Sequence, residues 1–239
     1  MTGPDTEGRR AVMDFVFMLT RDDRTVTDCL DVVDAVRDLG IRHIGFKDVG
    51  VDRATLRQLH ALLRDMGATT YLEIVSTDRD QALASVRTAA ELGVDVLMGG
   101  TWIEETLDLL RGTSTAYLPF PGRPVGHPTR LAGSPARIAE DCRRAEAAGC
   151  AGVDLLAYRA VDADPLDLVR AARGATTSRL VVAGSITGTD RIRALASAGA
   201  DAFTIGSAAF EGSLRPHAGT LAAQLAPVLA TVRELTGPR

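Results

Sequence analysis

The stretch RDLGIRHIGF, residues 37–46, ends a helical pattern at a glycine and then runs directly into a short apolar strand. The same order returns four more times, in RDMGATTYLEI (64–74), AELGVDVLM (90–98), EAAGCAGVDLL (146–156) and ASAGADAFTI (196–205). Strands that alternate with amphipathic helices are typical of a parallel sheet covered by helices. The repeat therefore predicts an α/β protein.

Eight such units fit into the chain. We expect strands at residues 12–19, 43–49, 69–75, 94–99, 115–120, 152–158, 179–185 and 202–206. We expect helices at about 26–39, 53–66, 78–92, 102–111, 135–148, 164–173, 189–198 and 218–235. Eight units close a (β/α)8 TIM barrel, a fold that typically takes ~250 residues. The 239 residues thus predict one barrel domain over residues 1–239, with 1–10 as a flexible tail.

An open doubly wound sheet is the alternative fold. That fold usually carries a glycine-rich turn after its first strand, whereas this chain has TRDDRTVTD at residues 20–28. The absence of that turn favours the barrel.

Charge and composition exclude several classes of protein. The net charge of −4 argues against a nucleic-acid binder, and the polar N-terminus argues against a signal peptide or membrane anchor. The three cysteines form no CxxC pair, and no metal-ligand spacing or cofactor motif is present. We expect a cytoplasmic protein without metal or cofactor; the sequence leaves a homo-oligomer open.

A Gly-Ser pair ends each of the last two expected strands. Gly184-Ser185 lies in VVAGSI (181–186), and Gly206-Ser207 lies in GADAFTIGSAAF (199–210). In barrels these two loops, with the N-terminus of a short extra helix, often bind phosphate, because glycine lets backbone N–H groups approach an anion. We expect a phosphate site formed by Gly184, Ser185, Gly206 and Ser207.

These two motifs resemble those of the phosphate-binding, or ribulose-phosphate-binding-like, TIM barrels. That group includes the phosphoribosyl isomerase of histidine biosynthesis, indole-3-glycerol-phosphate synthase and N-acetylmannosamine-6-phosphate epimerase. The resemblance covers about thirty residues and implies the fold and a phosphorylated ligand, without naming a reaction. The chain differs from the group's frequent Gly-Gly at the seventh strand, where it has Gly184-Ser185.

Lys47 is the only lysine among 27 basic residues, and the other 26 are arginines. Arginine cannot lose its proton near neutral pH or form a Schiff base, whereas a desolvated lysine can do both. A chain so rich in arginine that retains one lysine suggests a need for a primary amine at that position.

Alternation along the strands turns Lys47 and Glu73 into the barrel. In HIGFKDV (43–49) and TYLEIV (70–75) the apolar side chains face the helices, so Lys47 and Glu73 face inward on adjacent strands ~4.8 Å apart. In GVDLLAYRA (152–160) the same pattern turns Asp154 and Tyr158 inward. We expect Lys47, Glu73 and Tyr158 to form the catalytic group.

Three roles remain open for Lys47. It acts as a Schiff-base or acid/base amine, it binds substrate as a charge, or it is a structural partner of Glu73 in a buried ion pair. Aldolases related to the resembling barrels place their Schiff-base lysine chiefly on the sixth strand, where this chain has Leu156, Ala157 and Tyr158.

The longest irregular segment, residues 121–134, follows the fifth strand on the face where barrel active sites lie. Arg123, His127 and Arg130 are its candidate contacts to an anionic substrate. Together these features predict an enzyme of carbohydrate metabolism that acts on a small phosphorylated carbonyl compound or sugar, as an aldolase-like lyase or as an isomerase without a Schiff base. A non-catalytic barrel that senses a phosphorylated metabolite is the rival hypothesis.

Overall fold

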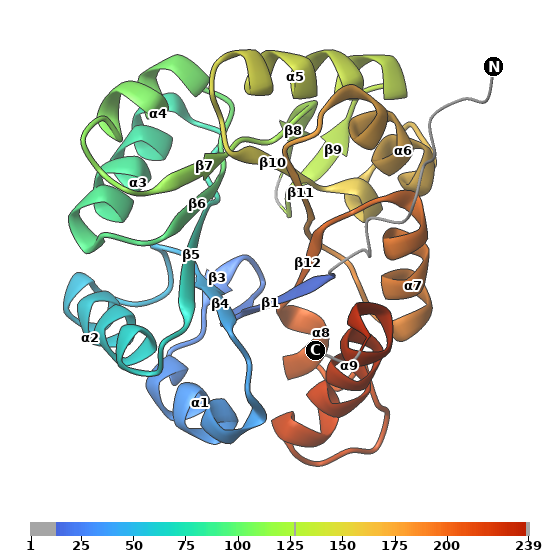
Figure 1. Ribbon diagram of the computed structural model, residues 1–239. Helices are drawn as coiled ribbons and strands as arrows, with labels where there is room; N and C mark the ends of the chain where they lie inside the picture. The colour runs from blue at the N-terminus through green and yellow to red at the C-terminus, as the bar shows by residue number, and fades with distance from the viewer. Residues whose placement is uncertain (1–12, 127, 238–239) are drawn as a thin grey trace.

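The computed structural model describes residues 13–126 and 128–237. Within these residues eight parallel strands form a single ring, surrounded by helices (Figure 1). The fold class predicted from the sequence is confirmed as a (β/α)8 TIM barrel. The tail predicted for residues 1–10 lies outside the described residues.

The barrel strands pair in the order of the chain. They are β1 (Asp14–Met18), β4 (His43–Phe46), β5 (Thr69–Ile74), β6 (Val96–Gly99), β7 (Ala116–Leu118), β10 (Gly152–Leu155), β11 (Arg179–Val182) and β12 (Ala202–Ile205). Strand β1 pairs with both β4 and β12, which joins the two ends of the chain. Between β7 and β10, the N–H of Ala151 donates to the carbonyl of Tyr117 at 3.0 Å, and the N–H of Asp154 donates to the carbonyl of Pro119 at 2.9 Å. These bonds complete the ring.

Several of the helices start at a residue whose side chain caps the first turn. The α-helices are α1 (Cys29–Val36), α2 (Arg53–Asp65), α3 (Arg79–Leu92), α4 (Ile103–Leu109), α5 (Pro135–Ala147), α6 (Pro165–Ala175), α7 (Thr189–Ala198), α8 (Ser207–Phe210) and α9 (Leu221–Thr236); the 3₁₀ turns are η1 (Arg37–Leu39) and η2 (Ala157–Arg159). The side chains of Ser134 and Asp164 accept backbone N–H groups at the starts of α5 and α6, each followed by proline. Proline is favoured there because its missing N–H has no intrahelical partner to lose.

Two short hairpins add to the ring at the carboxyl ends of its strands. The first pairs β2 (Thr20–Arg21) with β3 (Arg24–Thr25), and the second pairs β8 (Arg123–Val125) with β9 (Arg130–Ala132). Neither hairpin was predicted from the sequence. The strands predicted at 43–49, 152–158 and 179–185 each end three residues earlier, at Phe46, Leu155 and Val182.

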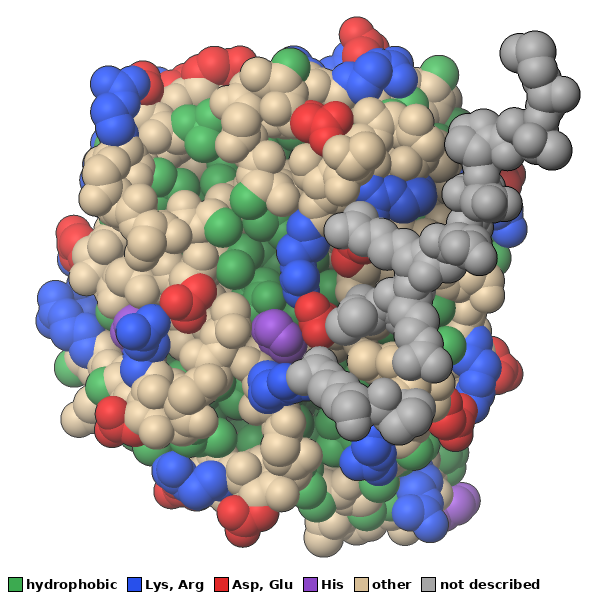
Figure 2. All heavy atoms as spheres, viewed as in Figure 1, with side chains coloured by type: hydrophobic (Ala, Val, Ile, Leu, Met, Phe, Trp, Pro, Cys, Tyr) green, Lys and Arg blue, Asp and Glu red, His purple; other side chains and the backbone are tan. Residues whose placement is uncertain are grey.

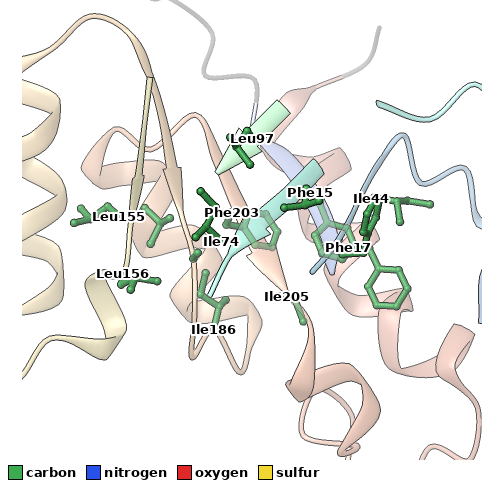
Figure 3. Packing of buried hydrophobic residues seen from close by; sticks show 14 of the residues in the cluster. Phe15, Phe17, Ile44, Ile74, Leu97, Leu155, Leu156, Ile186, Phe203 and Ile205 are labelled. Atoms are coloured by element: carbon green, nitrogen blue, oxygen red, sulfur yellow. The ribbon is translucent and has the colours of Figure 1, made fainter. Parts of the chain in front are cut away.

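Two apolar layers lie on either side of the strands. Side chains that face outward pack against the helices, and Phe15 of β1 stacks on Phe203 of β12 with ring centroids 5.3 Å apart (Figure 3). A smaller cluster fills the inside of the barrel, with Val16, Met18 and Tyr71 among its members. Inward positions nearer the strand ends carry Lys47, Glu73 and Asp154 instead, so the apolar filling gives way to charge toward the mouth of the barrel.

The outer surface mixes both signs of charge. On the face drawn in Figure 2, basic and acidic side chains are interspersed around the rim, with no extended field of one sign. Among the residues that the structure describes, no helix combines the length and apolar character needed to cross a bilayer.

Candidate active site

A cavity of about 510 Å3 opens at the carboxyl ends of the barrel strands. Its lining includes Lys47, Glu73 and both Gly-Ser strand ends singled out in the sequence. Strands of one parallel barrel all end on the same face, which is why residues so distant along the chain share one cavity.

Lys47 and Glu73 form a buried ion pair. Lys47 Nζ lies 3.2 Å from Glu73 Oε2, and the two residues are only 4% and 7% exposed. Lys47 directly follows β4, and Glu73 lies in the neighbouring β5. Period-two alternation on adjacent strands therefore accounts for the contact.

A second carboxylate, which the sequence analysis missed, binds the same lysine. Lys47 Nζ donates to Asp23 Oδ1 at 2.8 Å, and the guanidinium of Arg159 donates to both oxygens of Asp23 at 3.1 and 3.2 Å. Asp23 is buried and belongs to the two-residue turn of the β2–β3 hairpin. Asp23 therefore joins the two cations of the cavity floor.

Ion pairing dominates the charge states of these groups. Burial lowers the pKa of Lys47, but the nearby carboxylates of Glu73 and Asp23 outweigh it and hold the pKa above its ordinary value. Burial raises the pKa of Asp23, yet Lys47 and Arg159 bring it well below its usual range. In the free protein Lys47 is thus an ammonium ion and Asp23 a carboxylate.

Asp154 lies buried beneath this group with neither carboxyl oxygen hydrogen-bonded. Burial, together with the negative charge of Glu73, raises its pKa well above the ordinary value. Three carboxyls then face two cations, Lys47 and Arg159, and the charges balance when Asp154 keeps its proton. Within the described residues no cluster of histidine, cysteine and carboxylate side chains is suited to a metal ion.

Tyr158 lines the cavity from a different kind of element than the sequence predicted. It lies in the 3₁₀ turn η2, because β10 ends three residues earlier. Its half-buried ring packs under the guanidinium of Arg191, 4.5 Å from the ring centroid, and burial raises the pKa of its phenol. Arg191 also donates to the carbonyl of Ser185, which connects Tyr158 to the first Gly-Ser loop.

The first Gly-Ser loop has an unusual backbone. Gly184 and Ser185 have φ values of +80° and +57°, in the left-handed region that favours glycine. A Cβ at Gly184 would come within 2.4 Å of Arg159 Nε, so glycine here gives Arg159 the room to reach Asp23.

The second Gly-Ser loop contacts the β2–β3 hairpin. A Cβ at Gly206 would come within 2.7 Å of the carbonyl oxygen of Thr20. Ser207 Oγ accepts the backbone N–H of Asp22 at 3.3 Å. Both Gly-Ser loops therefore adjoin the cavity, and their role as a phosphate site stays a prediction.

The two described candidate contacts from residues 121–134 line different cavities. Arg130 lines the same cavity as Lys47, and it is exposed. Arg123 lines a neighbouring cavity of about 730 Å3 instead. His127 lies outside the described residues.

Comparison with known proteins supports the fold and the resemblance. Residues 122–215, less than half of the chain, match the family described as "Histidine biosynthesis protein". The matched stretch contains both Gly-Ser loops. A comparison with curated proteins gave no match.

Solved structures similar to this chain are similar along most of its length. The native KDPGal structure is 14% identical with a TM-score of 0.63, covering 98% of this chain and 97% of that one. The BexX/CysO complex of Amycolatopsis orientalis is 18% identical with a TM-score of 0.63, covering 97% and 95%. The carboxyl transferase domain of Rhizobium etli pyruvate carboxylase with 3-bromopyruvate is 15% identical with a TM-score of 0.64, covering 95% and 46%. At these identities the likeness is one of fold.

The protein is thus a TIM barrel by its strand order. The family match in its second half confirms the predicted resemblance to the group of barrels that includes the histidine-biosynthesis isomerase.

Proposed function

We propose that this barrel is an enzyme that acts on a small phosphorylated carbonyl compound or sugar, as a lyase or an isomerase. One observation carries the proposal: a single cavity contains a buried amine and carboxylate as well as two loops suited to an anion. An anion held at the Gly-Ser loops would direct the rest of a small substrate toward Lys47 and Glu73. The match of the loop region to a histidine-biosynthesis family supports the same reading.

The loops offer the phosphate end of the proposed site. Gly184 and Gly206 both line the cavity, and the backbone N–H groups of these two strand ends are the candidate donors to an anion. Ser185 and Ser207 add hydroxyl donors. Arg130, exposed at the edge of the cavity, supplies a further positive charge.

The other end of the cavity supports proton transfer next to a carbonyl group. A Lys47 ammonium can donate a hydrogen bond to the carbonyl oxygen and stabilise the negative charge that develops there. Glu73, 3.2 Å from Nζ, is placed to take a proton from the neighbouring carbon, and the Tyr158 phenol can return one. Removal and return of the proton on that carbon gives an isomerase. A lyase results if Glu73 instead takes the proton of a hydroxyl on the next carbon, so that the carbon–carbon bond breaks, one fragment leaves as an aldehyde or ketone, and the enolate of the other fragment receives a proton from Tyr158.

Schiff-base catalysis makes a stronger demand on the same residues. The Nζ atom would have to lose its proton, form a bond to the carbonyl carbon and release the carbonyl oxygen as water. The buried ion pairs of Lys47 with Glu73 and Asp23 oppose that loss. The charge state therefore favours the acid/base form of the proposal.

Ligand screening followed by turnover assays tests the function. Sugar phosphates and phosphorylated aldehydes and ketones are screened for a rise in melting temperature, because a ligand that binds only the folded state stabilises it. Compounds that bind are then followed by NMR in D2O, where an isomerase incorporates deuterium beside the carbonyl and a lyase produces two fragments.

Two variants complete the test. Lys47→Arg keeps the charge but not the amine geometry and should abolish turnover. Arg53→Gln removes an exposed cation that pairs with Glu91 outside the cavity, and it should leave turnover unchanged. Binding without any turnover across the panel would reject the enzyme in favour of a metabolite sensor.

A further inference from the structure

Among residues 13–126 and 128–237, Asp23 is the one carboxylate that contacts both Lys47 and Arg159. Its Oδ1 accepts from Lys47 Nζ at 2.8 Å and from Arg159 at 3.2 Å, while its Oδ2 accepts from Arg159 at 3.1 Å. Glu73 reaches Lys47 at the longer distance of 3.2 Å. The Lys47 ammonium is therefore hydrogen-bonded to Asp23 and ion-paired with Glu73.

The backbone that carries Asp23 has an uncommon left-handed conformation. Asp22 and Asp23 form the two-residue turn of the β2–β3 hairpin, and both have positive φ values, 52° and 58°. Hairpins favour such turns, but glycine or asparagine usually occupies them. Non-glycine residues are uncommon in this region, and such conformations tend to occur at functional sites.

The hairpin is also fixed to the backbone of Lys47. Thr25 Oγ1 donates to the carbonyl of Lys47 at 2.7 Å and accepts its N–H at 2.8 Å. A Cβ at Gly50 would come within 2.2 Å of the Thr25 carbonyl oxygen, so glycine permits this close approach. One hairpin thus holds the backbone of Lys47 through Thr25 and its side chain through Asp23.

We propose that Asp23 is a positioning residue that keeps the only lysine of the chain protonated and directed at Glu73, so that Lys47 works as a charged hydrogen-bond donor. The consequence rests on the proposed function, in which that donor polarises a substrate carbonyl. The charge and orientation of Lys47 do not depend on any substrate, so they can be tested separately.

Four charged or titratable side chains act on Lys47 from four elements. Asp23 on the hairpin turn and Glu73 on β5 favour its protonated form, and Arg159 on η2 opposes it. Burial and the negative charge of Glu73 raise the pKa of Asp154 on β10 well above its ordinary value. Asp23 accepts a hydrogen bond from Nζ directly, so removing its charge should weaken the hold on the proton.

The single lysine makes a direct test possible. Protein labelled only with [15N]lysine gives one side-chain Nζ signal, whose chemical shift follows the protonation of Lys47 as the pH is raised. The wild type should remain protonated beyond the titration range of an ordinary lysine. Asp23→Asn should move the midpoint down, and Asp23→Glu, which keeps the charge, should restore it at least in part.

A matched control separates this effect from general damage to the fold. Asp22→Asn changes the exposed neighbour in the same turn and should not move the midpoint. If Asp23→Asn does not fold, Arg159→Gln provides the opposite sign, because loss of the cation should keep Lys47 protonated to higher pH.

An unchanged midpoint in Asp23→Asn would overturn the proposal, as would a lower midpoint in Arg159→Gln. A wild-type Lys47 that titrates below an ordinary lysine would also reject it. Failure to find a substrate would contradict the proposed function and leave these titrations standing.

Discussion

Asp154 should make the protein less stable as the pH rises from acid toward neutral. The residue is fully buried, neither oxygen has a hydrogen-bond partner, and its pKa is raised well above the ordinary value. In the unfolded chain an aspartate loses its proton near pH ~4. Between that pH and its raised pKa, the folded state binds one more proton than the unfolded state, so stability falls as pH increases.

The size of this effect follows from linkage. A difference of one bound proton changes the free energy of unfolding by roughly 1.4 kcal/mol per pH unit. Above pH 5 the wild type should therefore lose up to about 1.4 kcal/mol per pH unit relative to Asp154→Asn, which cannot titrate, until the folded carboxyl releases its proton. For a chain of this length each such step corresponds to roughly 3–6 °C in melting temperature.

Thermal and urea unfolding of the two proteins, measured at half-unit pH steps, checks the prediction. Only the difference between them matters, because the other titrating groups are common to both. Asp154→Leu also removes the buried polar atoms and should be more stable than the wild type at pH 7 by about 1–3 kcal/mol. Stability curves of wild type and Asp154→Asn that run parallel from pH 5 to pH 7 would refute the reasoning.

The remaining predictions concern the lysine and the second Gly-Ser loop. Lys47→Met should lower the free energy of unfolding at pH 7, measured by urea unfolding, by about 3–5 kcal/mol, because it leaves the buried carboxylate of Glu73 without its partner and leaves Asp23 paired with Arg159 alone. On a substrate found by the screen, Lys47→Arg should reduce kcat by about 10²-fold or more and yield no borohydride-trapped adduct; near-normal kcat would show that the lysine acts only as a cation. Gly206→Ala should weaken binding of phosphorylated compounds in calorimetry, since its Cβ would come within 2.7 Å of a hairpin carbonyl oxygen, whereas Gly219→Ala enters open space and should bind normally.

The helices and strands that repeat in a regular order along the chain could be predicted from the sequence. All eight strands and the helices between them lie close to the expected ranges, because each unit repeats the same order of helix end, glycine and strand. The contact between Lys47 and Glu73 also agrees with the alternation of side chains along the strands. Glu73 lies within β5, and Lys47 directly follows β4, where the alternation still holds.

The rest of the candidate site depends on turns that have no period. Asp23 reaches Lys47 from a hairpin whose Asp-Asp turn lacks the usual Asn-Gly signal, so the hairpin was not predicted. Arg159 was missed because alternation was extended along residues 152–158, whereas β10 ends at Leu155 and a 3₁₀ turn redirects the chain. The one indication of the hairpin in the sequence was the pair Asp22-Asp23, which separates the two short strands.

A chain with a single, deeply buried lysine has only one side chain that amine-directed reagents can modify, and that side chain lies under the β2–β3 hairpin. Acylation of Nζ must then wait for the hairpin to move or for the barrel mouth to unfold locally. With a reagent slower than reclosing, the modification rate measures the equilibrium population of the open mouth. A ligand that closes the barrel mouth would therefore slow the acylation of Lys47 Nζ.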